Sequence, residues 1–152
     1  KYIAGKLGEA FAYEKEIRKT REAAQKAFFD EKDGVFTAER GEKKYTVLGN
    51  ALAVLAGVTA GEKAKTICEK IADGKMQDCS LSMKTFKYDA LLKCDKAKYQ
   101  SAVLEEIRKD YGKMLAAGAT SVWETTDGAS AFDNAGSLCH GWSAIPIIYL
   151  TK

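Results

Sequence analysis

Apolar residues recur at steps of three, four and seven positions along most of this chain, a spacing that places them on one face of an α-helix. The pattern predicts six helices, over residues 3–29, 46–56, a third that starts at a Thr59–Glu62 capping box, 84–93, 96–117 and 141–150. Because the sequence holds a single proline and little strand signal, we expect an all-α protein.

The connections between these helices alternate between short and long, which predicts three antiparallel helical hairpins. Residues 35–45 are expected to form a loop with a short strand pair. Residues 118–139 are expected to be irregular, because they are polar and contain glycine. Three hairpins with long apolar helices fit either a small bundle or one half of a larger ring.

The apolar pattern also predicts which side chains are buried. In the helix 46–56 we expect Leu48, Leu52 and Leu55 to point inward, toward a shared core. The last helix, 141–150, is nearly all apolar, so we expect it to be buried on every side.

The chain is 152 residues long, enough for one domain with its own core, and its net charge of +3 is small. Its basic residues are spread along the helices, so we expect no nucleic-acid partner, and no apolar run approaches the roughly 20 residues of a membrane span. The four cysteines form no C-x-x-C pair and are expected to be reduced thiols, which slightly favours the cytoplasm. We expect no cofactor and no metal, because no nucleotide-binding motif or metal-ligand spacing is present.

The residues that carry chemistry gather near the C-terminal end, in a segment with both tryptophans and the only histidine. Trp123 directly precedes Glu124, and Asp127 follows shortly after. Trp142 lies two positions after His140. An indole ring stacks on the C–H face of a sugar, while carboxylates activate water or bind hydroxyl groups. We therefore interpret these five residues as a candidate carbohydrate site.

Each of these residues also has a structural interpretation. Glu124 is then a surface loop residue, His140 a helix-start histidine bonded to a carbonyl, and Trp142 a core aromatic. Ser137 lacks the surroundings of a nucleophile elbow, and Cys139 directly neighbours His140, an arrangement that does not easily give a thiolate–imidazole pair. The open alternatives are an enzyme, a non-catalytic helical carbohydrate-binding module and a purely structural bundle.

Two tail segments resemble motifs of a known family. Gly118-Ala-Thr-Ser-Val-Trp-Glu124 is similar to G-A-T-[ST]-x-W-E, and Gly136-Ser-Leu-Cys-His140-Gly-Trp142-Ser-Ala-Ile-Pro146 is similar to S-L-[CN]-H-G-W-S-A-x-P. Upstream, residues 29–36 and 49–53 resemble F-x-D-x-x-x-G-x-[FY] and an N-A-L-A helix. These are motifs of the bacterial α-L-rhamnosidases and related six-hairpin glycosidases, and the resemblance covers nearly the whole chain.

The resemblance implies roles for the tail residues. Glu124 would be the general base that activates water in an inverting hydrolysis of terminal α-L-rhamnosides or a related sugar. His140 would contact the sugar, and Trp123 and Trp142 would line its subsite. Asp127 is added as a substrate-binding residue because of its place beside Glu124 in the sequence, not because of the resemblance. Glu124, His140 and Trp142 are expected to converge on one concave face.

The resemblance also implies a protein larger than this chain. Such enzymes use an (α/α)6 barrel of six hairpins, and this chain matches about half of it, the final three. Nothing here matches the acid-rich motif that supplies the family's general acid. We therefore expect residues 1–152 to be a single all-α domain, the C-terminal fragment of a larger catalytic domain and inactive alone. Its partner would be the N-terminal remainder or another chain, and its uncovered helices would expose an apolar patch.

Overall fold

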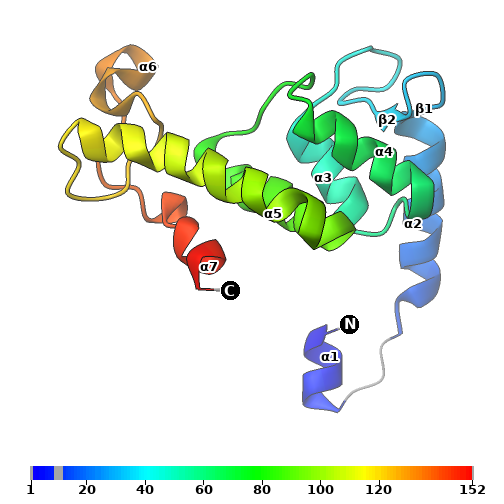
Figure 1. The fold of residues 1–152 in the computed structure, drawn as a ribbon. Helices are drawn as coiled ribbons and strands as arrows, with labels where there is room; N and C mark the ends of the chain where they lie inside the picture. Colours follow the sequence, from blue (N-terminus) through cyan, green and yellow to red (C-terminus); the bar gives the residue numbers. More distant parts are fainter. Residues whose placement is uncertain (1, 9–11, 152) are drawn as a thin grey trace.

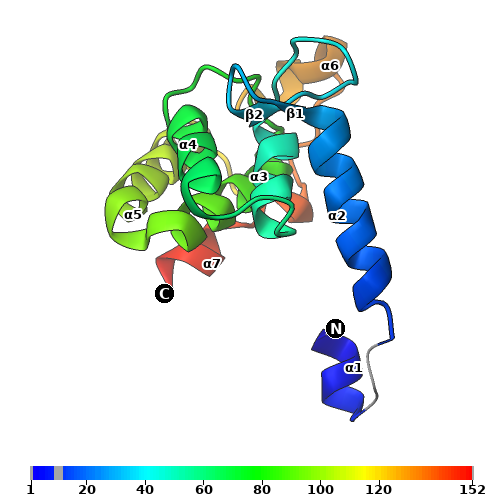
Figure 2. The same ribbon diagram turned by 90° about the vertical axis from the view of Figure 1, so that its right-hand side faces the viewer.

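The computed structural model describes residues 2–8 and 12–151, and most of them are helical (Figures 1 and 2). The helices are α1 (Tyr2–Leu7), α2 (Glu14–Phe28), α3 (Val47–Leu55), α4 (Gly61–Ala72), α5 (Lys84–Ala116), α6 (Ala131–Asn134) and α7 (Pro146–Leu150). Short 3₁₀ helices η1 (Leu81–Met83), η2 (Gly128–Ser130) and η3 (Gly141–Ser143) and the antiparallel strands β1 (Phe29–Asp30) and β2 (Val35–Phe36) complete the described elements. The all-α prediction is confirmed. Within the described ranges, no helix is both long and apolar enough to cross a membrane.

The long helix predicted over residues 3–29 is wrong, because two separate helices occupy this stretch. α1 ends at Leu7, and Gly8 follows with a φ of +70°, a left-handed conformation that ends a helix. α2 begins only at Glu14. Ala10, part of the predicted apolar stripe, lies outside the described residues.

The predicted strand pair is present, but it lies earlier in the chain than expected. β1 directly follows α2 and pairs with β2, so that Phe29 faces Phe36 across the ladder. Gly34 makes the turn between the strands with a φ of +65°. Most of the region 35–45 is therefore a loop that leads from β2 to the start of α3.

The core lies between α3, α4 and α5, which pack against one another. α4 confirms its prediction in detail, since its buried residues are the expected Ala64, Ile67, Cys68 and Ile71. The predicted capping box is wrong: the helix starts one residue after Ala60, which makes no side-chain capping bond.

α3 begins where predicted, and the Thr46 hydroxyl accepts the Gly49 N–H at 3.2 Å as an N-cap. The predicted inward face is wrong. Leu52 is 40% exposed and Leu48 and Leu55 are half-buried, whereas the buried residues are Val47, Asn50, Ala51, Ala53 and Val54. The small residues allow α3 to lie close to α4 and α5. Leu48 and Leu52 line a groove beside α2, whereas Leu55 packs at the edge of the core.

Asn50 fixes the loop after β2 to α3 from a fully buried position. Its Oδ1 accepts the Phe36 N–H at 2.8 Å, and its Nδ2 donates to the carbonyls of Phe36 and Thr46 at 2.9 and 3.0 Å. Because buried backbone groups must be hydrogen-bonded, this one amide satisfies polar groups that no ladder reaches.

α5 consists of two helices joined by a tight turn, as the break between the predicted helices 84–93 and 96–117 indicates. Asp95 leaves helical geometry, with φ and ψ of −157° and 96°, and its carboxylate accepts the Lys98 N–H at 3.0 Å. Asp95 therefore caps the second half, which runs back along the first as a hairpin.

An ion cluster joins the two halves of α5 to the loop before them. Lys84 Nζ lies 2.7 Å from carboxylate oxygens of both Glu106 and Asp110, and Lys87 Nζ lies 2.9 Å from Glu106. Asp78 lies 3.5 and 3.6 Å from the two ammonium groups. Burial acts to raise the pKa of Asp78, but the ammonium groups of Lys87 and Lys84 outweigh it and hold the pKa below its usual value.

Three long connections, residues 29–46, 73–83 and 117–145, meet at one end of the helices; in Figure 1 the first two run along the upper side, and the third lies at the left and descends toward α7. The first is tied to the second because the Gln77 N–H donates to the Tyr45 carbonyl at 3.0 Å. The second is tied to the third because η1 contacts η3. The short connections lie at the opposite end, so the alternation of short and long links is confirmed.

The two flanks of this row of helices carry uncovered apolar side chains. The prediction that residues 141–150 are buried is wrong, because Ile147 and Leu150 are each 67% exposed and only one side of α7, with Ile145 and Tyr149, packs inward. At the other flank, no side chain over the described length of α2 is buried. Both flanks therefore have the apolar faces expected of helices that pack against something else.

Candidate functional site

The two tail motifs lie side by side because their backbones are hydrogen-bonded. The Glu124 N–H donates to the Ser137 carbonyl at 2.9 Å, and the His140 N–H donates to the Val122 carbonyl at 2.8 Å. The Ser121 hydroxyl donates to the Leu138 carbonyl in the same ladder. Segments separated by a dozen residues in sequence thus form one paired unit in the third long connection.

Glu124 is half-buried, and its side chain is held by this pairing. Its Oε2 accepts the Ser137 N–H at 3.3 Å, so backbone and side chain of Glu124 both bond to the same residue. A carboxylate held by a backbone amide has a fixed direction, as a catalytic or a sugar-binding carboxylate requires. The geometry allows either chemistry.

Trp123 is half-buried and packs inside its own loop. Gly128 lies under its indole ring: a Cβ on Gly128 would stand 2.7 Å from two ring carbons, closer than any side chain tolerates. Gly128 is buried and has a φ of +59°, which glycine adopts most easily. The Trp123 ring therefore packs directly against Gly128, and both the lack of space and the backbone conformation require glycine at this position.

The loop that follows contains one turn of left-handed helix, which is labelled α6 in Figure 1. Phe132, Asp133 and Asn134 have φ of 51°, 57° and 70°, and the Ala135 N–H donates to the Ala131 carbonyl at 2.9 Å. Each such residue costs about 1–2 kcal/mol relative to the right-handed form, although Asp and Asn tolerate it best. Strained backbone of this kind is concentrated at functional sites.

The remaining predicted site residues lie in different surroundings. His140 is half-buried, and its carbonyl accepts the Ser143 N–H at 2.9 Å at the start of η3. Trp142 is 75% exposed. Asp127 is exposed, and its main chain makes its hydrogen bonds in the described loop, to Thr125 and Ser130. The structure therefore pairs the segments of Glu124 and His140, while Trp142 and Asp127 face outward.

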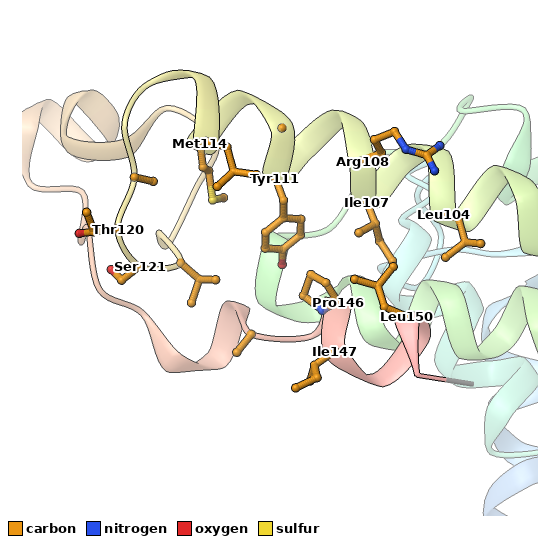
Figure 3. A pocket seen from close by; sticks show the side chains of 15 residues that line it. Leu104, Ile107, Arg108, Tyr111, Met114, Thr120, Ser121, Pro146, Ile147 and Leu150 are labelled. Atoms are coloured by element: carbon orange, nitrogen blue, oxygen red, sulfur yellow. The ribbon is translucent and has the colours of Figure 1, made fainter.

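An apolar groove of about 630 Å³ lies beside this unit, between the second half of α5 and α7 (Figure 3). We call it the α5–α7 groove; its walls include Leu104, Ile107, Tyr111, Met114, Pro146, Ile147 and Leu150, with residues 120–122 at one end. The sequence predicted an exposed apolar patch but not its place; the signal for the groove was the apolar spacing of Ile107, Tyr111 and Met114 along one face of α5.

Tyr111 crosses the groove and links its two walls. In Figure 3 its ring extends from α5 toward the chain before Pro146, and its hydroxyl donates to the Ser143 carbonyl. Burial, assisted by the Asp110 carboxylate, raises the pKa of Tyr111 to about 12, so the hydroxyl keeps its proton at neutral pH. This hydrogen bond positions η3, and with it the segment of His140, against α5.

Antiparallel helical hairpins whose long connections meet at one end, with the W-E and H-G-W segments paired there, define an all-α glycosidase domain of the six-hairpin class. The family model described as the bacterial alpha-L-rhamnosidase 6 hairpin glycosidase domain matches residues 2–152, and this chain belongs to that family. No curated protein matches the chain.

Two solved structures share the fold. A GH78 family rhamnosidase of Bacillus sp. GL1 is 27% identical with a TM-score of 0.73, over 87% of this chain and 15% of that one. A rhamnosidase from Klebsiella oxytoca, solved with rhamnose bound, is 22% identical with a TM-score of 0.75, over 91% of this chain and 28% of that one. The chain thus spans less than a third of either protein and corresponds to about half of a six-hairpin barrel.

Proposed function

We propose that this chain is the general-base half of an inverting glycoside hydrolase that acts on terminal α-L-rhamnosides or a related sugar. The observation that carries the proposal is the position of Glu124: it lies in the family's W-E motif, and Ser137 of the second motif holds its carboxylate at 3.3 Å. Family membership supports the reaction class, and the paired motifs support a shared site.

In this proposal, Glu124 takes a proton from the water molecule that attacks the anomeric carbon. Its Oε2 bonds to the Ser137 N–H, and its other oxygen accepts the proton. Inverting hydrolysis requires a second carboxyl group about 6.5–9.5 Å away, which protonates the leaving oxygen. We propose that this general acid comes from a segment outside the chain.

The other site residues are proposed to bind the sugar. The exposed Trp142 ring offers a stacking face, and Trp123, seated on Gly128, offers a second, fixed one. His140 is proposed to bond a sugar hydroxyl, as its place in the paired segments supports, and Asp127 to bind a hydroxyl from the loop tip.

We further propose that residues 1–152 form one domain, the C-terminal part of a larger catalytic domain. The family domain has six hairpins by its description, and this chain spans 15% and 28% of the two solved relatives. The α5–α7 groove and a groove of about 540 Å³ between α2 and α3 are the faces that the other hairpins, or a second chain, would cover. The four free thiols favour a reducing compartment such as the cytoplasm.

The test is hydrolysis of an aryl α-L-rhamnoside by the longest native form of the protein, beside its Glu124→Gln variant. We expect Glu124→Gln to lower kcat by about 10²–10⁴-fold, the usual contribution of a general base. Glu42→Gln, an exposed carboxylate in the first long connection, is the matched control and should leave kcat unchanged.

Two results would contradict the proposal. A Glu124→Gln variant with full activity would remove Glu124 from the chemistry. A folded protein that binds rhamnose in calorimetry, yet hydrolyses no member of a panel of aryl glycosides, would favour the carbohydrate-binding module.

A further inference from the structure

The loop from Glu124 to Ser137 closes on itself, and the closure point is next to the proposed base. Glu124 and Ser137 form the neck through two hydrogen bonds, one from each N–H. Immediately inside the neck, Gly136 touches Gly128. The neck and this glycine contact are therefore neighbouring parts of one closed loop.

The glycine contact leaves no room for a side chain. A Cβ on Gly136 would stand 2.0 Å from the Gly128 carbonyl oxygen and 3.0 Å from the Ala131 Cβ. The obstructing atom is backbone, so the loop would have to open to admit a methyl group. Gly136 does not have a positive φ, so the lack of space, and not the backbone conformation, requires glycine there.

The contact between Gly136 and Gly128 affects the rest of the loop, including the residues next to Glu124. Gly128, on the other side of the contact, carries the Trp123 ring, and Trp123 is bonded in sequence to Glu124. The left-handed turn at Phe132–Asn134 persists only where its surroundings hold it in place. Separating Gly136 from Gly128 would therefore free both Trp123, next to Glu124, and the left-handed turn that precedes Ser137.

The geometry points to Gly136 as a positioning residue for Glu124: its contact with Gly128 sets the distance at which the Ser137 N–H meets the Glu124 carboxylate. This inference rests on the proposed function of Glu124 for its importance in catalysis, but the positioning itself is a property of the chain as described. Gly128 contributes to the same positioning because the Trp123 ring packs directly against it.

The test is an NMR titration of the ¹⁵N-labelled 152-residue chain, with the Ser137 amide as the reporter. In the unmodified chain its proton shift should follow the ionisation of Glu124, and Glu124→Gln should abolish that response. Gly136→Ala should reduce the response to less than half. Gly141→Ala is the matched control, because a Cβ there meets nothing within 4 Å, and it should keep the full response.

A Ser137 amide that titrates in Gly136→Ala as in the unmodified chain overturns the inference, whether or not the protein hydrolyses rhamnosides. Gly128→Ala provides a second variant if Gly136→Ala does not fold, and a red shift of Trp123 fluorescence with an unchanged circular dichroism spectrum is expected from it. In the longest native form, Gly136→Ala should lower kcat by about 10²-fold while KM changes little, as expected for a misplaced catalytic group.

Discussion

The centre of this molecule and its two flanks use apolar residues in opposite ways. In the centre, α4 buries its apolar stripe, and Ile67 of α4 and Tyr88 of α5 are each 0% exposed. At the flanks, α2 buries no described side chain, and α7 leaves Ile147 at 67% exposure. The chain itself covers the apolar side chains of the centre. The apolar side chains of the flanks are of the kind found in a core, but no part of the described chain covers them. A half-ring is expected to show this difference at its two ends.

The largest difference should appear when a large apolar side chain is removed from each region. Ile67→Ala should lower the free energy of unfolding by about 2–5 kcal/mol, because it leaves a cavity in a packed core. Ile147→Ala at the flank should change it by less than about 0.5 kcal/mol. Chemical denaturation followed by circular dichroism measures both, and equal losses would show that α7 is as well packed as α4.

A smaller loss is expected where the centre meets the long connections. Asn50→Ala removes the only described side-chain partners of the Phe36 N–H and carbonyl, and should cost about 1–3 kcal/mol. Leu52→Ala, on the flank side of the same helix, is the control. If the two variants unfold at the same denaturant concentration, the buried amide contributes no more than an exposed leucine.

The ion cluster should make the stability of the centre depend on acid. The pKa of Asp78 is lowered in the folded protein, so its stabilising contribution is complete above the unfolded value of about 4 and is lost as the pH falls through the folded value. Asp78→Asn should flatten the loss of stability below about pH 4. The thermal midpoint measured from pH 2 to 6 tests this, and an unchanged slope would contradict it.

The smallest effect on stability, with a visible effect on the surface, is expected from a charge placed on the flank. Ile147→Asp should leave the unfolding curve nearly unchanged but reduce the binding of an apolar fluorescent dye to the α5–α7 groove. Phe132→Asp, with a similar exposure of 63% outside the groove, is the matched control. Sedimentation of both variants and the unmodified chain distinguishes an open groove from one covered by a second copy.

The buried stripe of the centre was predictable from sequence, whereas at the flanks only the presence of an exposed apolar patch was predictable and not its place, for one physical reason. Periodicity shows that a face is apolar, but not whether the same chain covers it. The α4 stripe was correct because its neighbours are present, whereas the leucines of α3 and the whole of 141–150 were placed in a core that this chain does not complete. The interruption after Leu7 was missed because Gly8 breaks a helix without breaking the apolar spacing.

The candidate site was predictable as a set of residues but not as a geometry. Local motifs indicate Glu124 and His140, yet their backbone pairing depends on a loop closed by Gly128 and Gly136. The residue types do not predict three successive left-handed residues at Phe132–Asn134, because phenylalanine rarely adopts that conformation. The roles proposed for the five site residues stay predictions, and Glu124→Gln tests the one on which the reaction depends.

The gathering of the three long connections at one end has a consequence for how such a protein changes over time. Each doubling of a loop's length costs only about 0.6 kcal/mol of closure entropy, so this end can gain or lose residues while the helices keep their packing. Insertion and deletion in 29–46, 73–83 and 117–145 can therefore reshape the surroundings of the candidate site. The turn at Asp95, at the opposite end, has no such freedom, because a single added residue would shift the two halves of α5 out of register.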